Sequence, residues 1–466
     1  MEPPLAGPPK RTARRWAPSL SSLVRVSTIA PAARFPALTD VSLSSFFPVG
    51  TQYFYGYPSG EHSGFFNAVP PFIEEIVAAR ALSCAGAWVT PVVFASSIDP
   101  LTQEILREDL GMAPARRQPI VLPSTINETL SGPQRNRSIV RALSGILAPK
   151  KFVMAQPYMD TCLQTRFALP PALTLWLNDK VNMPRYVPPA FLPERYAECA
   201  NGRAFAASPS TFPTPCVVKV SSSSSGDGVR ICRTEEELRN AQREFAKVKT
   251  GIIVDEHVEA VRNFGIQFGI PSDPAQEIEL IGVSEQLTTP EGAFIGGLVD
   301  PDNLFARIDG VNDLLLHHVL PAVREMGWYG IGGFDVLVDS RNRFFIVDPN
   351  FRMTGMTAFL CTARNGTVRK CMASFVGTFE GNRTDFVRAI APLARPGARQ
   401  RLHIVALTHR NGTFRMSAAL LFGRDEEHEV PRLAGEFLAL GLQSRALERL
   451  KRNGREHYPD LPGASV

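Results

Sequence analysis

The sequence predicts an α/β protein built from several lobes, and three features indicate this class. Short apolar strands alternate with helices near the start of the chain. The strands 215–220 and 229–232 enclose a loop of serine and glycine, which predicts a hairpin. Farther along, the strands 334–338 and 344–347 are joined by the turn 339–343 and carry carboxylates at one end. Such mixed segments are typical of α/β and α+β lobes packed together.

The composition limits the possible functions before any motif is considered. A chain of 466 residues predicts two to four domains, at roughly 100–200 residues each. Hydrophobic residues make up 44% and charged residues 20%, which excludes a largely disordered protein. The net charge of +5 is too small for this length to indicate nucleic-acid binding. No apolar run approaches the ~18 residues that a membrane-spanning helix requires.

The cysteines and the N-terminus bear on where the protein works. The 7 cysteines form no CxxC pair, so neither a zinc ribbon nor a disulfide scaffold is expected, and a reducing, cytoplasmic setting fits. Residues 1–44 are expected to form a basic tail rich in Pro, Ser and Ala that buries too little to fold. For residues 1–39 the alternative is a mitochondrial transit peptide, because this stretch is rich in Arg and Ser and nearly free of acids.

Residues 45–175 are expected to form an N-terminal α/β domain, because strands and helices alternate along them. No GxGxxG motif follows any of these strands, so nothing indicates a dinucleotide site. The expected strands lie at 87–95, 120–122 and 151–155, and the expected helices at 72–82 and 139–147.

A lysine beside a flexible loop marks the next lobe, expected over residues 176–258. Lys219 lies in an apolar strand, directly before the loop Ser221–Gly228. Small residues leave backbone N–H groups accessible to phosphate oxygens, so this loop is a candidate phosphate lid. The alternatives are a strand lysine whose amine reaches solvent and a plain flexible linker.

Amphipathic spacing predicts a helix after this hairpin. Thr234 and Glu237 form the capping-box pattern at its start. A strand over 251–254 then runs into Asp255 and Glu256. The apolar stripe of the helix consists of Leu238, Ala241, Phe245 and Val248.

A pair of carboxylates marks the lobe expected over residues 259–395. If the strands around the turn 339–343 pair, Asp335 and Asp348 converge at one end of the sheet, while Asp339 faces solvent at the other. With Asn350 they offer hard oxygen ligands of the kind that Mg²⁺ takes. The alternative is that Asp348-Pro349-Asn350 only forms a turn. Arg352 adds a positive fork for a transferring phosphoryl group.

The remaining expected elements complete these lobes. Adjacent His317 and His318 on a helix point in different directions and do not predict a metal site. Gln286 could contact substrate, although a solvated strand end is the favoured interpretation. The second lobe has expected strands at 264–270 and 279–283 and a helix at 314–326, and residues 396–466 form a small C-terminal subdomain with strands at 402–408 and 413–421 and a helix at 433–440.

The motifs stand in a recognisable order. They are NDK at Asn178–Lys180, VVK with SSSSSGDGV, VDEHV, GIGGFDVLVD and VDPNFR. Over roughly residues 150–395 this set resembles the ATP-grasp superfamily, and weaker similarity to about residue 450 points to its peptide-ligase branch. The resemblance implies an ATP-grasp fold with an N-terminal α/β pre-ATP-grasp domain and a small C-terminal subdomain.

The resemblance also implies roles for particular residues. Arg352 matches the arginine that steadies the phosphorylated intermediate and, with Lys219, is an expected catalytic residue. Asp335, Asp348 and Asn350 match the metal ligands. Two departures are Val220 where proline is common and Asp348 where glutamate is usual, and the shorter Asp348 could weaken one magnesium ion. The residues matching nucleotide-binding positions are Lys180, Lys219, Ser224, Ser225, Gly226, Gly228, Asp255, Glu256, Val258 and Asn263.

The implied activity is that of an ATP-dependent carboxylate–amine ligase. It would activate a carboxylate as an acyl phosphate and join it to an amine, releasing ADP and phosphate. ATP and Mg²⁺ are expected, with two ions and with Mn²⁺ as a substitute, and the partners are small carboxylates and amines without nucleic acid or membrane. A homodimer is one option, and secondary-metabolite biosynthesis is the expected setting. The alternatives are an ATP-grasp enzyme with a non-amine acceptor and a catalytically silent nucleotide-binding protein.

Overall fold

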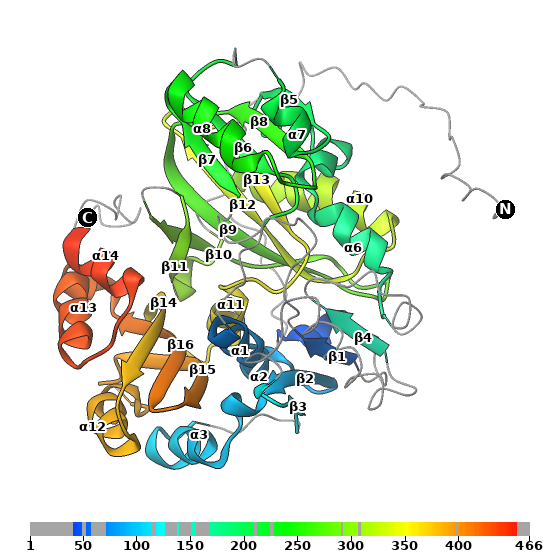
Figure 1. Ribbon diagram of the computed structural model, residues 1–466. Coiled ribbons are helices and arrows are strands. Elements are labelled where there is room, and N and C mark those ends of the chain that lie inside the picture. Colours follow the sequence, from blue (N-terminus) through cyan, green and yellow to red (C-terminus); the bar gives the residue numbers. More distant parts are fainter. Residues whose placement is uncertain are drawn as a thin grey trace. The chain divides into compact units, whose positions relative to one another are not determined.

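Within the described residues the strands form three sheets (Figure 1). Residues 40–466 make up one compact unit. The expected helix at 139–147, the lid residues 224–226 and the tail up to residue 40 lie outside the described residues. The structure is a computed structural model that describes residues 41–48, 53–56, 71–112, 118–125, 138, 151–154, 167–208, 212–223, 228–289, 292–305, 309–397 and 399–453.

The N-terminal sheet is parallel, with the strand order β3-β2-β1-β4. Every residue of β2 is buried, as expected for a strand covered on both faces. This sheet and its helices confirm the α/β character expected of the region. The elements are η2 (Leu43–Phe46), β1 (Tyr53–Gly56), α1 (Pro71–Ala79), α2 (Ala81–Cys84), β2 (Val89–Phe94), α3 (Pro100–Glu104), β3 (Ile120–Leu122) and β4 (Lys151–Met154).

The start of this region lies closer to the N-terminus than composition indicated. Val41 and Leu43, placed in the tail by the sequence, are fully buried. The Val41 N–H donates to Asn365 Oδ1 at 2.7 Å. The ordered chain therefore begins before residue 44, because these apolar side chains have a core to enter.

A second, antiparallel sheet has the order β5-β8-β6-β7 and is packed against α7 and α8 (Figure 1). The hairpin expected around the small-residue loop is β6 and β7, with Lys219 opposite Val229. Thr234 Oγ1 accepts from Glu237 N–H at 3.2 Å, as the capping pattern predicted, while the Glu237 carboxylate accepts from the Arg233 N–H. The elements are β5 (Arg195–Cys199), α7 (Gly202–Ala206), β6 (Cys216–Val220), β7 (Val229–Cys232), α8 (Glu235–Phe245) and β8 (Ile252–Glu256).

The third sheet has eight strands in the order β13-β12-β9-β10-β11-β14-β16-β15, all paired antiparallel. The C-terminal strands extend this sheet through β14 and do not form one of their own. The strands are β9 (Ala260–Ile270), β10 (Glu279–Thr288), β11 (Phe294–Val299), β12 (Gly330–Asp339), β13 (Phe344–Asn350), β14 (Cys371–Glu380), β15 (Leu402–Arg410) and β16 (Thr413–Phe422).

Helices cover this sheet, and one of them differs from the expected form. The helix expected at 314–326 contains a π turn, because Pro321 has no N–H and the Leu320 N–H bonds to Leu315 O. No helix in the described ranges is long and apolar enough to cross a bilayer. The helices are α6 (Pro171–Asn178), η6 (Lys180–Arg185), α9 (Asp309–Leu314), η9 (Leu315–Val319), α10 (Leu320–Glu325), α11 (Thr357–Arg364), α12 (Arg383–Ala394), α13 (Val430–Ala439) and α14 (Arg445–Asn453).

Candidate active site

Two carboxylates face each other on the edge pair of the eight-stranded sheet. Asp335 of β12 lies directly opposite Asp348 of β13, and Gly333 lies opposite Asn350. Asp348 and Asn350, two residues apart on one strand, point to the same face. The hairpin thus brings the three expected metal ligands to one end of the sheet.

The pairing of these carboxylates has an electrostatic consequence. Burial and the neighbouring charge of Asp348 raise the pKa of Asp335 to about 7, although hydrogen bonding from Gln286 and the charges of Arg352 and Lys180 oppose this rise. Two carboxylates cannot both ionise at low cost in a buried place without a cation nearby. The donor set therefore fits a divalent cation, and its hard oxygens suit Mg²⁺.

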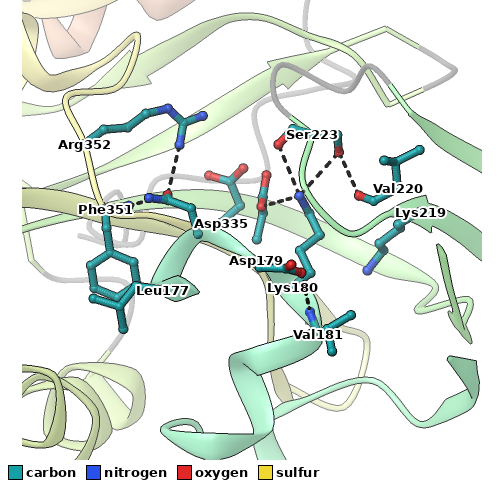
Figure 2. Close-up of polar contacts among 12 residues, drawn as sticks. Leu177, Asp179, Lys180, Val181, Lys219, Val220, Ser223, Asp335, Phe351 and Arg352 are labelled. Carbon is teal, nitrogen blue, oxygen red and sulfur yellow. Dashed lines mark hydrogen bonds and ion pairs between the residues drawn. The ribbon is translucent and has the colours of Figure 1, made fainter. Parts of the chain in front are cut away.

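Lys180 places its ammonium group beside the carboxylate of Asp348 (Figure 2). Its Nζ lies 2.9 Å from Asp348 Oδ1 and 3.3 Å from the carbonyl oxygen of Ser223, which stands at the start of the small-residue loop. The Lys180 side chain is only 3% exposed. Asp179 begins the short helix η6 by accepting from the Val181 N–H at 3.1 Å, which fixes the backbone beside the lysine. Lys180 therefore connects Asp348 to the loop.

Arg352 lies just after β13, and the segment that carries Lys180 also contacts this arginine. Asn178 Oδ1 accepts from the Phe351 N–H at 2.9 Å and from Arg352 Nη1 at 3.5 Å (Figure 2). Asn178 Nδ2 in turn donates to the Thr174 carbonyl within α6. The single stretch 178–180 thus contacts both the arginine and, through Lys180, the carboxylate.

The second lysine has a different partner. Lys219 Nζ lies 3.1 Å from Asp255 Oδ2, and Arg195 Nε lies 3.1 Å from Asp255 Oδ1. Both oxygens of this buried carboxylate are therefore engaged by cations. Asp255 is paired with Lys219 and Arg195, and its expected contact with the nucleotide stays a prediction.

These charged groups border a cavity. The rest of its lining is apolar, as is common for small-molecule sites. Among the residues that line the cavity are Met183, Leu192, Arg195, Lys219, Ile253, Asp255, Ile346 and Val347.

Part of this chain is similar to a known protein family. Residues 196–350 match the protein family described as L-aspartate–L-methionine ligase, ATP grasp. These residues are therefore similar to an ATP-grasp ligase domain. The fold agrees: an N5-carboxyaminoimidazole ribonucleotide synthetase in an ADP complex aligns with a TM-score of 0.52 and 10% identity, covering 89% of this chain and 100% of its own.

Two further solved structures show the same fold. The biotin carboxylase domain of Hydrogenobacter thermophilus 2-oxoglutarate carboxylase, with MgADP, ADP and bicarbonate, has a TM-score of 0.52 and 12% identity, covering 88% of this chain and 95% of its own. An Aspergillus clavatus carboxyaminoimidazole ribonucleotide synthase with ATP has a TM-score of 0.50 and 9% identity, covering 84% and 99%. At these identities the likeness shows the ATP-grasp fold alone.

The other residues expected at the ATP-grasp nucleotide site are placed less directly. The Glu256 N–H donates to the Glu194 carbonyl at 2.8 Å. Val258 is buried, and Asn263 Oδ1 is buried without a hydrogen-bond partner within the described part of the chain. Gly228 closes the lid loop at a φ of +76°, which favours glycine. Ser224, Ser225 and Gly226 lie outside the described residues.

One residue at the site, Arg195, was not indicated by the sequence. Three others were indicated only through a motif, a loop or an alternative role in substrate contact: Asn178, Ser223 and Gln286. The favoured interpretation of Gln286 as a solvated strand end is wrong, because its Nε2 donates to Asp335 Oδ1 at 2.7 Å. Asn178 had a signal, since it stands in the NDK motif two residues before Lys180. In the described residues no group of three His, Cys, Asp or Glu side chains could hold a metal ion.

Proposed function

We propose that this ATP-grasp protein is an ATP-dependent amino-acid ligase, which joins the carboxylate of one amino acid to the amine of another. The observation that carries the proposal is the pair Asp335 and Asp348, with Lys180 and Arg352 beside it. Facing carboxylates flanked by cations suit a site that holds a metal and transfers a phosphoryl group. The matched family, described as L-aspartate–L-methionine ligase, supports amino acids as both substrates.

The nucleotide and metal have candidate contacts. Asp335, Asp348 and Asn350 would hold Mg²⁺, which when bound neutralises charge on the phosphates. Lys180 neutralises Asp348 in the structure described, and its amine lies close enough to the loop carbonyl of Ser223 to turn towards a phosphate. Lys219, paired with Asp255, would supply a second ammonium group for the phosphates.

The proposed reaction has two steps. A carboxylate oxygen of the first amino acid attacks the γ-phosphorus of ATP, the bond to ADP breaks, and an acyl phosphate forms. The amine of the second amino acid then attacks the acyl carbon, the C–O bond to phosphate breaks, and an amide, phosphate and a proton are released. Arg352, fixed by Asn178, would offset negative charge on the transferred group, and the loop 221–228 would exclude water from the acyl phosphate.

An isotope experiment tests this proposal. ADP release is measured with single amino acids and with pairs, beginning with aspartate and methionine, and the products are identified by mass spectrometry. The expected result is ADP release that requires both amino acids and yields a dipeptide. With an ¹⁸O-labelled carboxylate, one label should appear in the released phosphate, because the oxygen bridging carbon and phosphorus leaves with phosphorus.

The same experiment separates the alternatives. ADP release without an amine but with a thiol or bicarbonate would support a different acceptor. Nucleotide binding without ADP release under any pair would support a silent nucleotide-binding protein. The complete set of two lysines, two carboxylates and an arginine favours turnover. The expected place in secondary-metabolite biosynthesis stays a prediction.

A further inference from the structure

A polar row crosses the eight-stranded sheet beside the proposed metal site. The strands stand in the order β13, β12, β9, β10. Asp348 lies opposite Asp335, Asp335 lies opposite Gly265, and Gly265 lies opposite Ser284. Because side chains alternate along a strand, Gln286 stands on the same face of β10 as Ser284. The row therefore leads from the carboxylates to an amide two strands away.

The Gln286 amide reaches across the intervening strand. Its Nε2 donates to Asp335 Oδ1 at 2.7 Å, although β10 and β12 are not neighbours. Adjacent strands lie about 4.8 Å apart, so the Gln286 side chain, the hydrogen bond and the Asp335 side chain together span roughly twice that distance. They can do so because β9 presents Gly265 at this point: a Cβ there would lie 3.1 Å from Gln286 Nε2 and 3.2 Å from Ser284 Oγ.

This contact makes the two oxygens of Asp335 unequal. Oδ1 accepts the amide hydrogen, so Oδ2 is the oxygen more open to a cation shared with Asp348. A neutral donor orients the carboxylate without competing for it, whereas a lysine or arginine at this position would offset the charge that attracts the metal. Groups that orient metal ligands from behind typically contribute tenfold to hundredfold to metal affinity.

We propose that Gln286 is a positioning residue of the metal site, which fixes the Asp335 carboxylate by reaching over Gly265. The inference rests on the proposed role of Asp335 as a metal ligand. It assigns to β10 a part in nucleotide-dependent metal binding that no motif indicates. Gly265 belongs to the same arrangement, because it leaves the space that the amide crosses.

Metal binding without turnover tests the inference. Gln286→Met keeps the length of the side chain and removes the amide donor. The dissociation constant of Mn²⁺ is measured with saturating ADP by electron paramagnetic resonance of the free ion. We expect Mn²⁺ to bind about tenfold more weakly in Gln286→Met, while ADP binding in the presence of a chelator stays at the parent value. Gln276→Met, the same change at an exposed glutamine, is the matched control and should bind Mn²⁺ like the parent.

A second variant, Gly265→Ala, keeps the inference testable if Gln286→Met does not fold. Gly265→Ala retains Gln286 but places a methyl group where the amide crosses, so the amide or Ser284 must move by a few tenths of an ångström. We expect a smaller loss of Mn²⁺ affinity, about threefold, in a protein whose melting temperature is measured alongside. Parent-like affinity in both folded variants overturns the inference.

A double-substitution cycle shows whether Gln286 acts through Asp335. In an Asp335→Asn background, Gln286→Met should cost no further Mn²⁺ affinity. An equal loss in both backgrounds means that Gln286 acts independently of Asp335 and overturns the positioning role. If Asp335→Asn alone leaves Mn²⁺ affinity unchanged, the proposed metal site is wrong and the inference falls with it. If Asp335→Asn weakens binding and Gln286→Met does not, only the inference fails.

Discussion

Asp335 lies directly opposite Asp348 on the antiparallel strands β12 and β13. The hairpin carries a third aspartate, Asp339, at its turn. The sequence placed Asp339 in solvent, and this is wrong: it is 7% exposed, and its carboxylate accepts from the Arg341 N–H and the Arg343 N–H at 2.9 Å each. A carboxylate in a tight turn finds these donors locally, so it is buried without facing the site. At one end of the hairpin two aspartates thus face each other, and at the other end one aspartate holds the turn.

We predict that Asp348→Asn and Asp339→Asn fail in different ways. Asp348→Asn removes charge from the proposed metal site, so the rate of ADP release should fall at least tenfold and be partly restored by added Mg²⁺. Asp339→Asn weakens the turn and should lower the free energy of unfolding, with unchanged Mg²⁺ dependence. Rates against Mg²⁺ concentration and urea unfolding of both variants check this. Matching behaviour of the two variants would mean that Asp348-Pro349-Asn350 is only a turn.

The buried ion pair at Asp255 leads to a second prediction. Asp255→Asn leaves the Lys219 and Arg195 cations without their shared carboxylate, and breaking a buried pair on one side costs about 3–5 kcal/mol. Lys219→Met leaves Asp255 paired with Arg195, so it should cost less stability but abolish ATP turnover. Urea unfolding and ADP release measured on both variants separate these effects. Wild-type-like ATP consumption by Lys219→Met would remove Lys219 from the proposed phosphate contacts.

Local patterns in the sequence explain which parts could be predicted. The β6–β7 and β12–β13 hairpins involve strands joined by short segments, so period and turn residues indicated both, and with them the facing carboxylates. Partners from distant strands could not be predicted in this way. Gln286 meets Asp335 only because β9 stands between β10 and β12, an order that no local pattern contains.

The burial of charged groups could not be predicted from the sequence either. Asp255 and Arg195 are 60 residues apart, and they meet because β5 pairs with β8. Acidic residues at a strand end suggested contact with ligand, but they did not indicate that both Asp255 oxygens are paired with cations. An acidic residue at a strand end thus indicates a site, but the residues that pair with it depend on the order of the strands in the sheet.

The N-terminal boundary gives a third prediction. Removing residues 1–39 should leave ADP release and the melting temperature unchanged, because composition gives that stretch no packed role. Removing residues 1–47 should prevent stable folding, because it deletes the buried side chains of Val41, Leu43 and Phe46. Thermal unfolding of the two truncated proteins is the measurement. A large loss of melting temperature for the shorter deletion would show that the tail packs on the rest of the chain.

His403 on β15 gives the last prediction, which concerns pH. Burial lowers the pKa of His403 to about 4, against roughly 6.5 for an unfolded histidine. The folded protein therefore keeps this imidazole neutral, and the unfolded chain gains a proton first as the pH falls. Stability contributed by the neutral form is complete above pH 6.5 and is lost progressively down to about pH 4, by at most about 3 kcal/mol.

A non-titrating variant isolates this effect from the carboxylates that also titrate near pH 4. The free energy of unfolding in urea is measured at several pH values between 7 and 4 for the parent and for His403→Asn. The parent should lose more stability than the variant over this range, since only the parent takes up a proton at this position on unfolding. Parallel pH profiles for the two proteins would show that His403 titrates alike in the folded and unfolded chains, and that its burial does not make the protein sensitive to acid.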